Sequence, residues 1–170
     1  YFRSTAASLF ATEAAITAIE ELLETILSDK SNMDDFCASI DKHLIQLERS
    51  VIARWHERVE DDYSKNPFLD SEILKVDEKH KEKYLKGERI EAAYGSTLIA
   101  VACTDAFWFG IHIGDGKCIT CDYRGNFAEP VPWDEKCFLN VTTSISDSNA
   151  IDTVSYTHLL AHETRGNLVC

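Results

Sequence analysis

The stretch that decides the fold is residues 96–123, STLIAVACTDAFWFGIHIGDGKCITCDY. It contains three short apolar runs, at residues 96–102, 107–113 and 117–123, and a small polar or glycine turn separates each run from the next. Short apolar runs divided by such turns are typical of an antiparallel meander. The sequence therefore predicts three consecutive antiparallel strands.

The second of these runs presents a different set of side chains on each face. Because successive side chains of a strand point to opposite faces, its residues divide into two sets. One set is Phe107, Phe109, Ile111 and Ile113, and the other is Trp108, Gly110 and His112. The run 96–102 is small or apolar on both faces, so we expect its strand to be covered on both sides.

The turn after the second run places Asp115 between Gly114 and Gly116. Hairpin geometry does not require an aspartate flanked by glycines, so this turn is the first place to look for function. The alternative is a turn aspartate that accepts a hydrogen bond from its own backbone. The residues alone leave both interpretations open.

The composition is that of one globular domain. The chain has 170 residues, of which 45% are hydrophobic and 27% charged, enough for a single core and too few for two ordinary domains. Its formal charge of −12 argues against a nucleic-acid or anionic-membrane partner, because phosphate groups are bound by Lys and Arg. The sequence shows neither an apolar run of about 20 residues that could span a bilayer nor a secretory signal. We expect a cytoplasmic protein.

The cysteines are predicted to be reduced and structural. Most lie within apolar runs, which is typical of buried thiols in a cytosolic protein. Cys118 and Cys121 have a zinc-like spacing, but residues three apart on a strand point to opposite faces and could not share a metal. The six are Cys37, Cys103, Cys118, Cys121, Cys137 and Cys170.

Residues 5–27 are predicted to form a long amphipathic helix, with Ser4 as its N-cap. Its apolar residues recur at helical spacing, and many alanines favour helix and allow close packing on a sheet. The apolar residues are Leu9, Ile16, Ile19, Leu23 and Ile26.

A second helix is predicted over about residues 34–59, with Asn32 as N-cap. One stripe of large apolar side chains runs along it, and we interpret this stripe as core. The stripe is Phe36, Ile40, Leu44, Leu47, Val51, Trp55 and Val59.

The remaining segments complete an α+β arrangement. Residues 61–89 are polar and are predicted to be a surface excursion with one short helix. Residues 124–126 should close a hairpin, and residues 138–145 should form a fourth strand. Two helices followed by a meander indicate a helix pair layered on antiparallel sheet.

The last segment, residues 154–170, closely resembles a translated transposase sequencing adapter. Leu160 differs from that frame by a single base. We expect residues 154–170 to be read-through of library DNA, outside a domain of residues 1–153. A metal site at His158 and His162 is therefore not expected.

Three motifs, taken in their order and spacing, resemble the middle of a bacterial metal-dependent protein phosphatase of type 2C. They are YGSTL at residues 94–98, IGDG at residues 113–116 and NVTTS at residues 140–144. Residues 1–4 and the alanine-rich helix also fit the segment that follows the first metal motif of that family. The resemblance spans nearly all of residues 1–153.

The resemblance implies both a fold and a reaction. The family fold is an α-β-β-α sandwich, two packed antiparallel sheets flanked by helix pairs, which this chain would contain in part. The reaction is hydrolysis of phosphoserine and phosphothreonine in a protein substrate, by water activated between two Mn²⁺ or Mg²⁺ ions. Such hard ions require oxygen ligands, which the family supplies mainly as aspartates.

The resemblance transfers one site residue. Asp115 matches an aspartate that in some members helps to hold a third, weaker metal, although Gly116 stands here instead of the more usual serine-arginine pair. The phosphate-binding arginine and the other metal aspartates are expected before Tyr1 and after Thr153. We therefore expect an inactive internal fragment of a phosphatase. The alternatives are a non-catalytic phosphatase-like binding domain and an unrelated α+β interaction domain.

Overall fold

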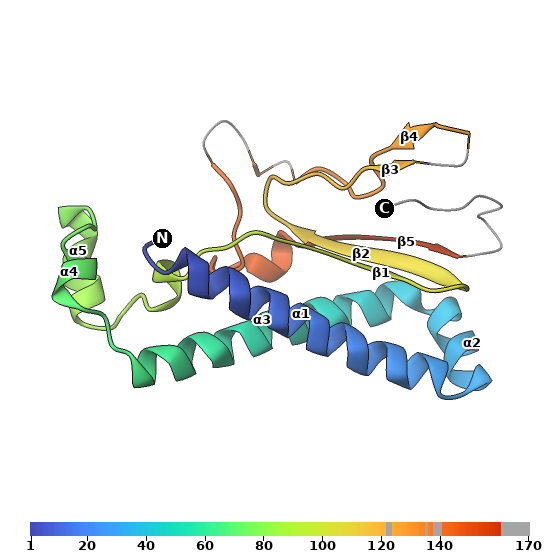
Figure 1. The fold of residues 1–170 in the computed structure, drawn as a ribbon, viewed down its shortest axis with the longest axis horizontal. Helices are drawn as coiled ribbons and strands as arrows, with labels where there is room; N and C mark the ends of the chain where they lie inside the picture. The colour runs from blue at the N-terminus through green and yellow to red at the C-terminus, as the bar shows by residue number, and fades with distance from the viewer. Residues whose placement is uncertain (122–123, 135, 138–140, 161–170) are drawn as a thin grey trace.

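The computed structural model describes residues 1–121, 124–134, 136–137 and 141–160 (Figure 1). Two long helices, α1 (Ser4–Leu27) and α3 (Ile40–Lys65), form a layer on one face of a three-stranded antiparallel sheet. The shorter helix α2 (Lys30–Ala38) connects them. The predicted α+β class, with a helix pair packed on antiparallel sheet, is confirmed.

The three-stranded sheet has the order β1-β2-β5. Its strands are β1 (Leu98–Cys103), β2 (Phe107–Ile113) and β5 (Ser155–Leu160). Residues 108–113 of β2 pair with β1, and residues 107–112 of β2 pair with β5. The central strand of the sheet is therefore β2, and all seven of its residues are buried. The run that was expected to be covered on both sides, residues 96–102, supplies the edge strand β1 instead.

The predicted meander is wrong in its third strand. Within residues 117–123, strand β3 covers Thr120–Cys121 and pairs with β4 (Phe127–Ala128) in a separate two-stranded sheet. The second edge of β2 is already occupied by β5, so the chain after β2 turns away from the sheet. The hairpin predicted around residues 124–126 is confirmed, with Gly125 at a φ of +81°.

Strand β5 lies within residues 154–170, the segment that was expected outside the fold. The structure instead places Ser155–Leu160 in the main sheet, where each residue has a register partner on β2. A place in the sheet does not test the origin of residues 154–170. Their derivation from adapter DNA stays a prediction, as does a domain limited to residues 1–153. His162 lies outside the described residues.

Helix α1 begins at Ser4, with Arg3 at the cap position and no side-chain cap bond, so the predicted Ser4 N-cap is wrong. The stripe predicted to be its core face is also partly wrong, because Leu9 and Ile16 are 55% and 51% exposed. Small side chains let α1 lie close to α3 and β1, and the helix buries that face instead. The buried residues are Ala7, Phe10, Ala11, Ala14, Ala15, Ala18 and Ile26.

The second predicted helix is two helices in the structure. Asp29, not Asn32, caps α2 and accepts a hydrogen bond from Ser31 N at 2.6 Å. Ser39 separates α2 from α3, and its hydroxyl donates to the backbone carbonyl of Asp35 at 2.8 Å, a local bond that competes with helix continuation. All seven stripe residues are nevertheless buried, as predicted.

Residues 61–89 contain more helix than the sequence indicates. Helix α3 continues to Lys65, and two short helices follow, α4 (Asp70–Ile73) and α5 (Glu78–Leu85). The short 3₁₀ turns η1 (Glu91–Ala93) and η2 (Ala150–Asp152) complete the described elements. Among the helices that the structure describes, none is both long and apolar enough to cross a bilayer.

Strand β1 is not covered on both faces, contrary to the prediction. Ile99 and Val101 are 41% and 37% exposed, whereas Ala102 is buried. Of the predicted fourth strand, residues 138–140 lie outside the described residues, and residues 141–145 form one bridge and a turn. Ile145 N donates to Ser96 O at 3.0 Å and holds this segment beside the start of β1.

Candidate metal-binding corner

Strand β2 ends in the turn at residues 114–116, and the first residue of this turn must be glycine. Gly114 has a φ of +114°, and an added Cβ would lie 2.4 Å from Thr97 Cγ2. A side chain at this position would be both strained and blocked. The turn therefore has a defined backbone path, and Asp115 projects from it into solvent.

Asp115 is held by a distant part of the chain. Its Oδ2 accepts a hydrogen bond from Thr142 Oγ1 at 3.1 Å, across 27 residues of sequence. This contact favours a positioned carboxylate over a turn aspartate that bonds its own backbone. The structure thus brings together two of the motifs, at residues 113–116 and 140–144, that carry the family resemblance.

Asp134 is a second carboxylate near the turn; unlike Asp115 it is buried, and both of its oxygens accept hydrogen bonds. Thr143 Oγ1 donates to Asp134 Oδ2 at 2.7 Å, and Lys136 N donates to Oδ1 at 2.9 Å. The thiol of Cys137 lies 3.8 Å from the same carboxylate. Asp134 therefore connects Thr143 with Lys136 and Cys137.

His112 lies beneath the turn. It is 4% exposed, and its Nε2 has no hydrogen-bond partner among the described residues. An added Cβ on Gly116 would lie 3.8 Å from this Nε2 and 2.8 Å from Ile99 Cδ1, so the turn packs directly on both side chains. Burial lowers the pKa of His112, and the charges of Asp134 and Asp115 oppose that shift. This favours a neutral imidazole.

Asp115 and Thr142, at the corner formed by the turn 114–116 and residue 142, have the chemistry of part of the ligand set of a weak metal site. The exposed carboxylate of Asp115 and the hydroxyl of Thr142 are oxygen donors of the kind that Mn²⁺ and Mg²⁺ prefer. In the described part of the chain, however, no group of three or more His, Cys, Asp or Glu side chains could hold a metal ion. A complete two-metal centre is therefore not formed by the described residues.

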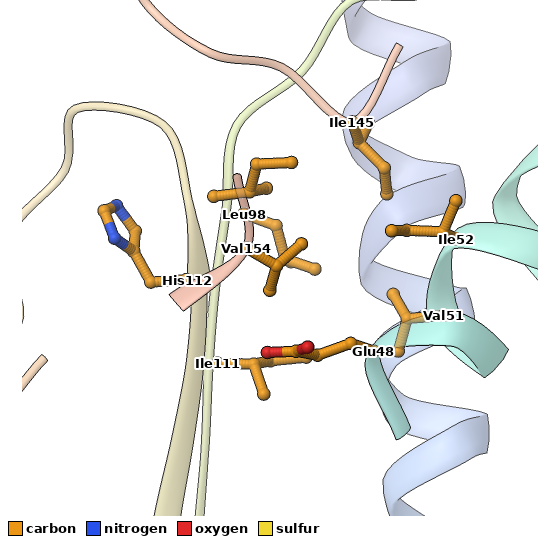
Figure 2. A pocket seen from close by; sticks show the side chains of 9 residues that line it. Glu48, Val51, Ile52, Leu98, Ile111, His112, Ile145 and Val154 are labelled. Atoms are coloured by element: carbon orange, nitrogen blue, oxygen red, sulfur yellow. The ribbon is translucent and has the colours of Figure 1, made fainter. Parts of the chain in front are cut away.

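Glu48, which was not among the residues singled out from the sequence, is the most unusual ionisable group of the helix layer. It is 4% exposed, its Oε1 has no hydrogen-bond partner among the described residues, and burial raises its pKa to about 7. Figure 2 shows its carboxylate at the contact between α3 and the sheet, beside Ile111. The signal was available, because Glu48 lies next to Leu47 and one helical turn after Leu44 on the predicted core stripe.

The family model for protein phosphatase 2C matches residues 2–170. The chain belongs to the protein phosphatase 2C family. No curated protein and no solved structure matches it. The family relation predicted from the three short motifs is thereby confirmed. The mixed architecture is consistent with a partial fold of this phosphatase family, in which the helix pair and one sheet are present.

Proposed function

We propose that this chain is part of a metal-dependent serine/threonine protein phosphatase and that Asp115 is a ligand of its outer, weaker metal site. The supporting observation is that Asp115 follows a fully buried strand yet is exposed, with Thr142 bound to one of its oxygens. A carboxylate held in this way needs little reorganisation to meet a cation. The parent protein is proposed to be bacterial and cytoplasmic.

The residues of this corner have distinct roles in the proposal. Gly114 sets the path of the turn, and Thr142 orients the carboxylate of Asp115. When bound, Mn²⁺ or Mg²⁺ in the complete centre supplies an activated water for the hydrolysis of phosphoserine or phosphothreonine. The partner is a phosphorylated protein.

The chain of residues 1–170 is proposed to be inactive by itself. At the corner, Asp134 is already engaged by Thr143 and the Lys136 backbone, which leaves Asp115 as the carboxylate able to take a metal. The same observation is compatible with a second function, in which a phosphatase-like domain binds phosphoproteins without hydrolysing them. The two functions differ in whether a metal-loaded parent turns over substrate.

Calorimetric titration with Mn²⁺ tests the role of Asp115. The chain offers a matched control in Asp105, an exposed aspartate in the turn at the opposite end of the same hairpin. We expect Asp115→Ala to weaken Mn²⁺ binding by about tenfold or more, which corresponds to about 1.4 kcal/mol, and Asp105→Ala to leave the isotherm unchanged. An identical isotherm for Asp115→Ala and the unmodified chain would show that Asp115 is a turn residue only.

Hydrolysis of para-nitrophenyl phosphate with Mn²⁺ tests the proposed inactivity. We expect no turnover that tracks this chain through purification. Robust turnover that tracks it, and that falls in Asp115→Ala, would overturn the inactivity while supporting the metal role. Turnover by the full-length parent would exclude the non-catalytic alternative.

A further inference from the structure

A single carboxylate is enclosed between the helix layer and the main sheet. Glu48 extends from α3 toward β2, and the side chains around its cavity come from α3, β1, β2 and the segment before β5 (Figure 2). Apart from Glu48 and His112, these side chains are apolar: Val51, Ile52, Leu98, Ile111, Ile113, Ile145 and Val154.

The cavity is too small and too apolar to hydrate an ionised carboxylate. Its volume is about 10 Å³, which is about the room that one water molecule needs, and a buried water generally needs at least two polar partners. Burying a charge without a partner is strongly unfavourable. The closed packing therefore suits the protonated form of Glu48.

Among the described residues, the titratable groups of the surrounding elements do not supply a positive charge near Glu48, whose raised pKa comes from burial. On β2, His112 projects to the side of the strand away from Glu48 (Figure 2). On β5, burial and the charges of Asp41 and Glu48 raise the pKa of Tyr156, so this phenol stays neutral. The ion pairs between α3 and α1, formed by Arg54 and Arg58, lie at the exposed edge of the helix layer.

The remaining neighbouring groups are acidic or distant. Asp41, on α3 itself, lies 3.9 Å from His158 Nδ1 and is exposed, and Asp152 at η2 is also exposed. From β1 the cavity receives only the apolar Leu98 among the described residues. Ionisation of Glu48 therefore has to be met by water.

We propose that Glu48 is a proton-linked switch in the contact between α3 and the sheet. When the carboxyl group is protonated, α3 packs closed on β2 and on Val154. When it loses its proton, water enters and this contact opens locally. Because Ile111 and Ile113 line the cavity, the strand whose packing changes is the one that leads directly into the turn at residues 114–116. The proposal does not depend on the phosphatase function.

Carbon-13 NMR of the glutamate side chains tests the first step on the unmodified protein. The Cδ resonance that disappears in Glu48→Gln assigns Glu48. We expect its titration midpoint near 7, as against 4.5 for an unperturbed glutamate. We also expect the protection of the α3 amides around Val51 to fall over the same pH range, once the intrinsic base-catalysed rise in exchange is divided out, relative to the helix end at Lys65. A midpoint near 4.5, or protection of the α3 amides that is independent of pH, would overturn the proposal.

Urea unfolding as a function of pH tests the second step. The pKa of Glu48 is higher in the folded state, so that state holds the proton more tightly and stability falls as pH rises between the two pKa values. From about pH 5.5 to about 8.5, a folded pKa of about 7 lowers the folding equilibrium constant by about 30-fold. Glu48→Gln should remove this dependence.

Glu60 is the matched control, because it is an exposed glutamate on the same helix. Glu60→Gln should retain the pH dependence of the unmodified chain. An equal pH dependence in Glu48→Gln would contradict the switch. If Glu48→Gln does not fold, the resonance is assigned from backbone correlations in the unmodified protein, and its titration and α3 exchange decide the question.

Discussion

Replacement of Arg3 by lysine is the most direct test of how this fold is held together at its N-terminal end. The Arg3 side chain is 11% exposed and donates to both oxygens of Glu72, at 3.0 and 2.9 Å. Its Nη1 also donates to Tyr94 Oη at 2.6 Å and to the carbonyl of Asn66 at 2.7 Å. One guanidinium thus joins the end of α3, helix α4 and the segment before β1.

The expected loss in Arg3→Lys follows from the geometry of these contacts. Lysine keeps the charge but lacks the planar fork, so it cannot bind both oxygens of Glu72 and also reach Tyr94. Each hydrogen bond to a charged group contributes about 1.5–3 kcal/mol, and lysine recovers part of one. We expect Arg3→Lys to lower the free energy of unfolding by about 2–4 kcal/mol.

The contribution of Arg3 should also depend on pH. The hydrogen bond from Arg3 lowers the pKa of Glu72 below its ordinary value of 4.5. A carboxyl group with a depressed folded-state pKa stabilises the fold fully above its unfolded pKa, and that stability is lost as the pH falls through the folded pKa. The difference between Arg3→Lys and the unmodified chain should therefore be largest near neutral pH and shrink below about pH 4.5.

Urea unfolding at neutral pH measures this difference, with the midpoint and slope fitted separately. Arg54→Lys is the matched control, because Arg54 also pairs with a glutamate, Glu21, but in an exposed ion pair. Such pairs contribute about 0–1 kcal/mol. Equal losses in Arg3→Lys and Arg54→Lys would refute the reasoning, because they would show that enclosure and the forked geometry of Arg3 add nothing.

Three further substitutions test other parts of the structure by the same unfolding assay. Gly114→Ala should lower the free energy of unfolding by about 1–3 kcal/mol more than Gly125→Ala does. The new Cβ at residue 114 would meet Thr97, whereas nothing lies within 4 Å of a Cβ at residue 125. Equal losses would mean that the turn at residues 114–116 adjusts to the side chain. Phe36→Ala should lower the free energy of unfolding by about 3–5 kcal/mol, because Phe36 is fully buried. Leu9→Ala should lower it by under about 0.5 kcal/mol, because Leu9 is 55% exposed. The reverse order would show that α1 buries the face that carries Leu9. Thr157→Pro should destabilise the chain by removing a ladder hydrogen bond of β5, and unchanged stability would show that β5 does not pair with β2.

Several parts of the fold could be predicted because they follow from local pattern. The core stripe of α3 has helical spacing over many residues, and a helix with one apolar face must bury it. The hairpin of β1 and β2 follows from short apolar runs divided by a polar turn, because such runs pair with their neighbours along the chain. Asp115 was a candidate site residue because hairpin geometry does not require an aspartate between two glycines. The family relation likewise rests on short motifs read along the chain.

Other parts could not be predicted because they depend on competition between distant segments. Residues 117–123 and Ser155–Leu160 both have strand character, and only the assembled sheet shows that the second one occupies the edge of β2. In α1, alanines and larger apolar side chains offered two possible core faces. Close approach to α3 and β1 selected the alanine face, because dense packing outweighs the larger area of Leu9 and Ile16.

By itself the sequence determined the α+β class, the buried apolar stripe, the strands β1 and β2, the family relation and the choice of Asp115 as a candidate site residue. These features are encoded in residues that are neighbours along the chain. The tertiary structure alone decided that Thr142 holds Asp115, that Arg3 joins three segments, and that Glu48 is enclosed between α3 and the sheet. Hydrogen bonding and desolvation depend on which distant groups meet, so they exist only once the layers have packed.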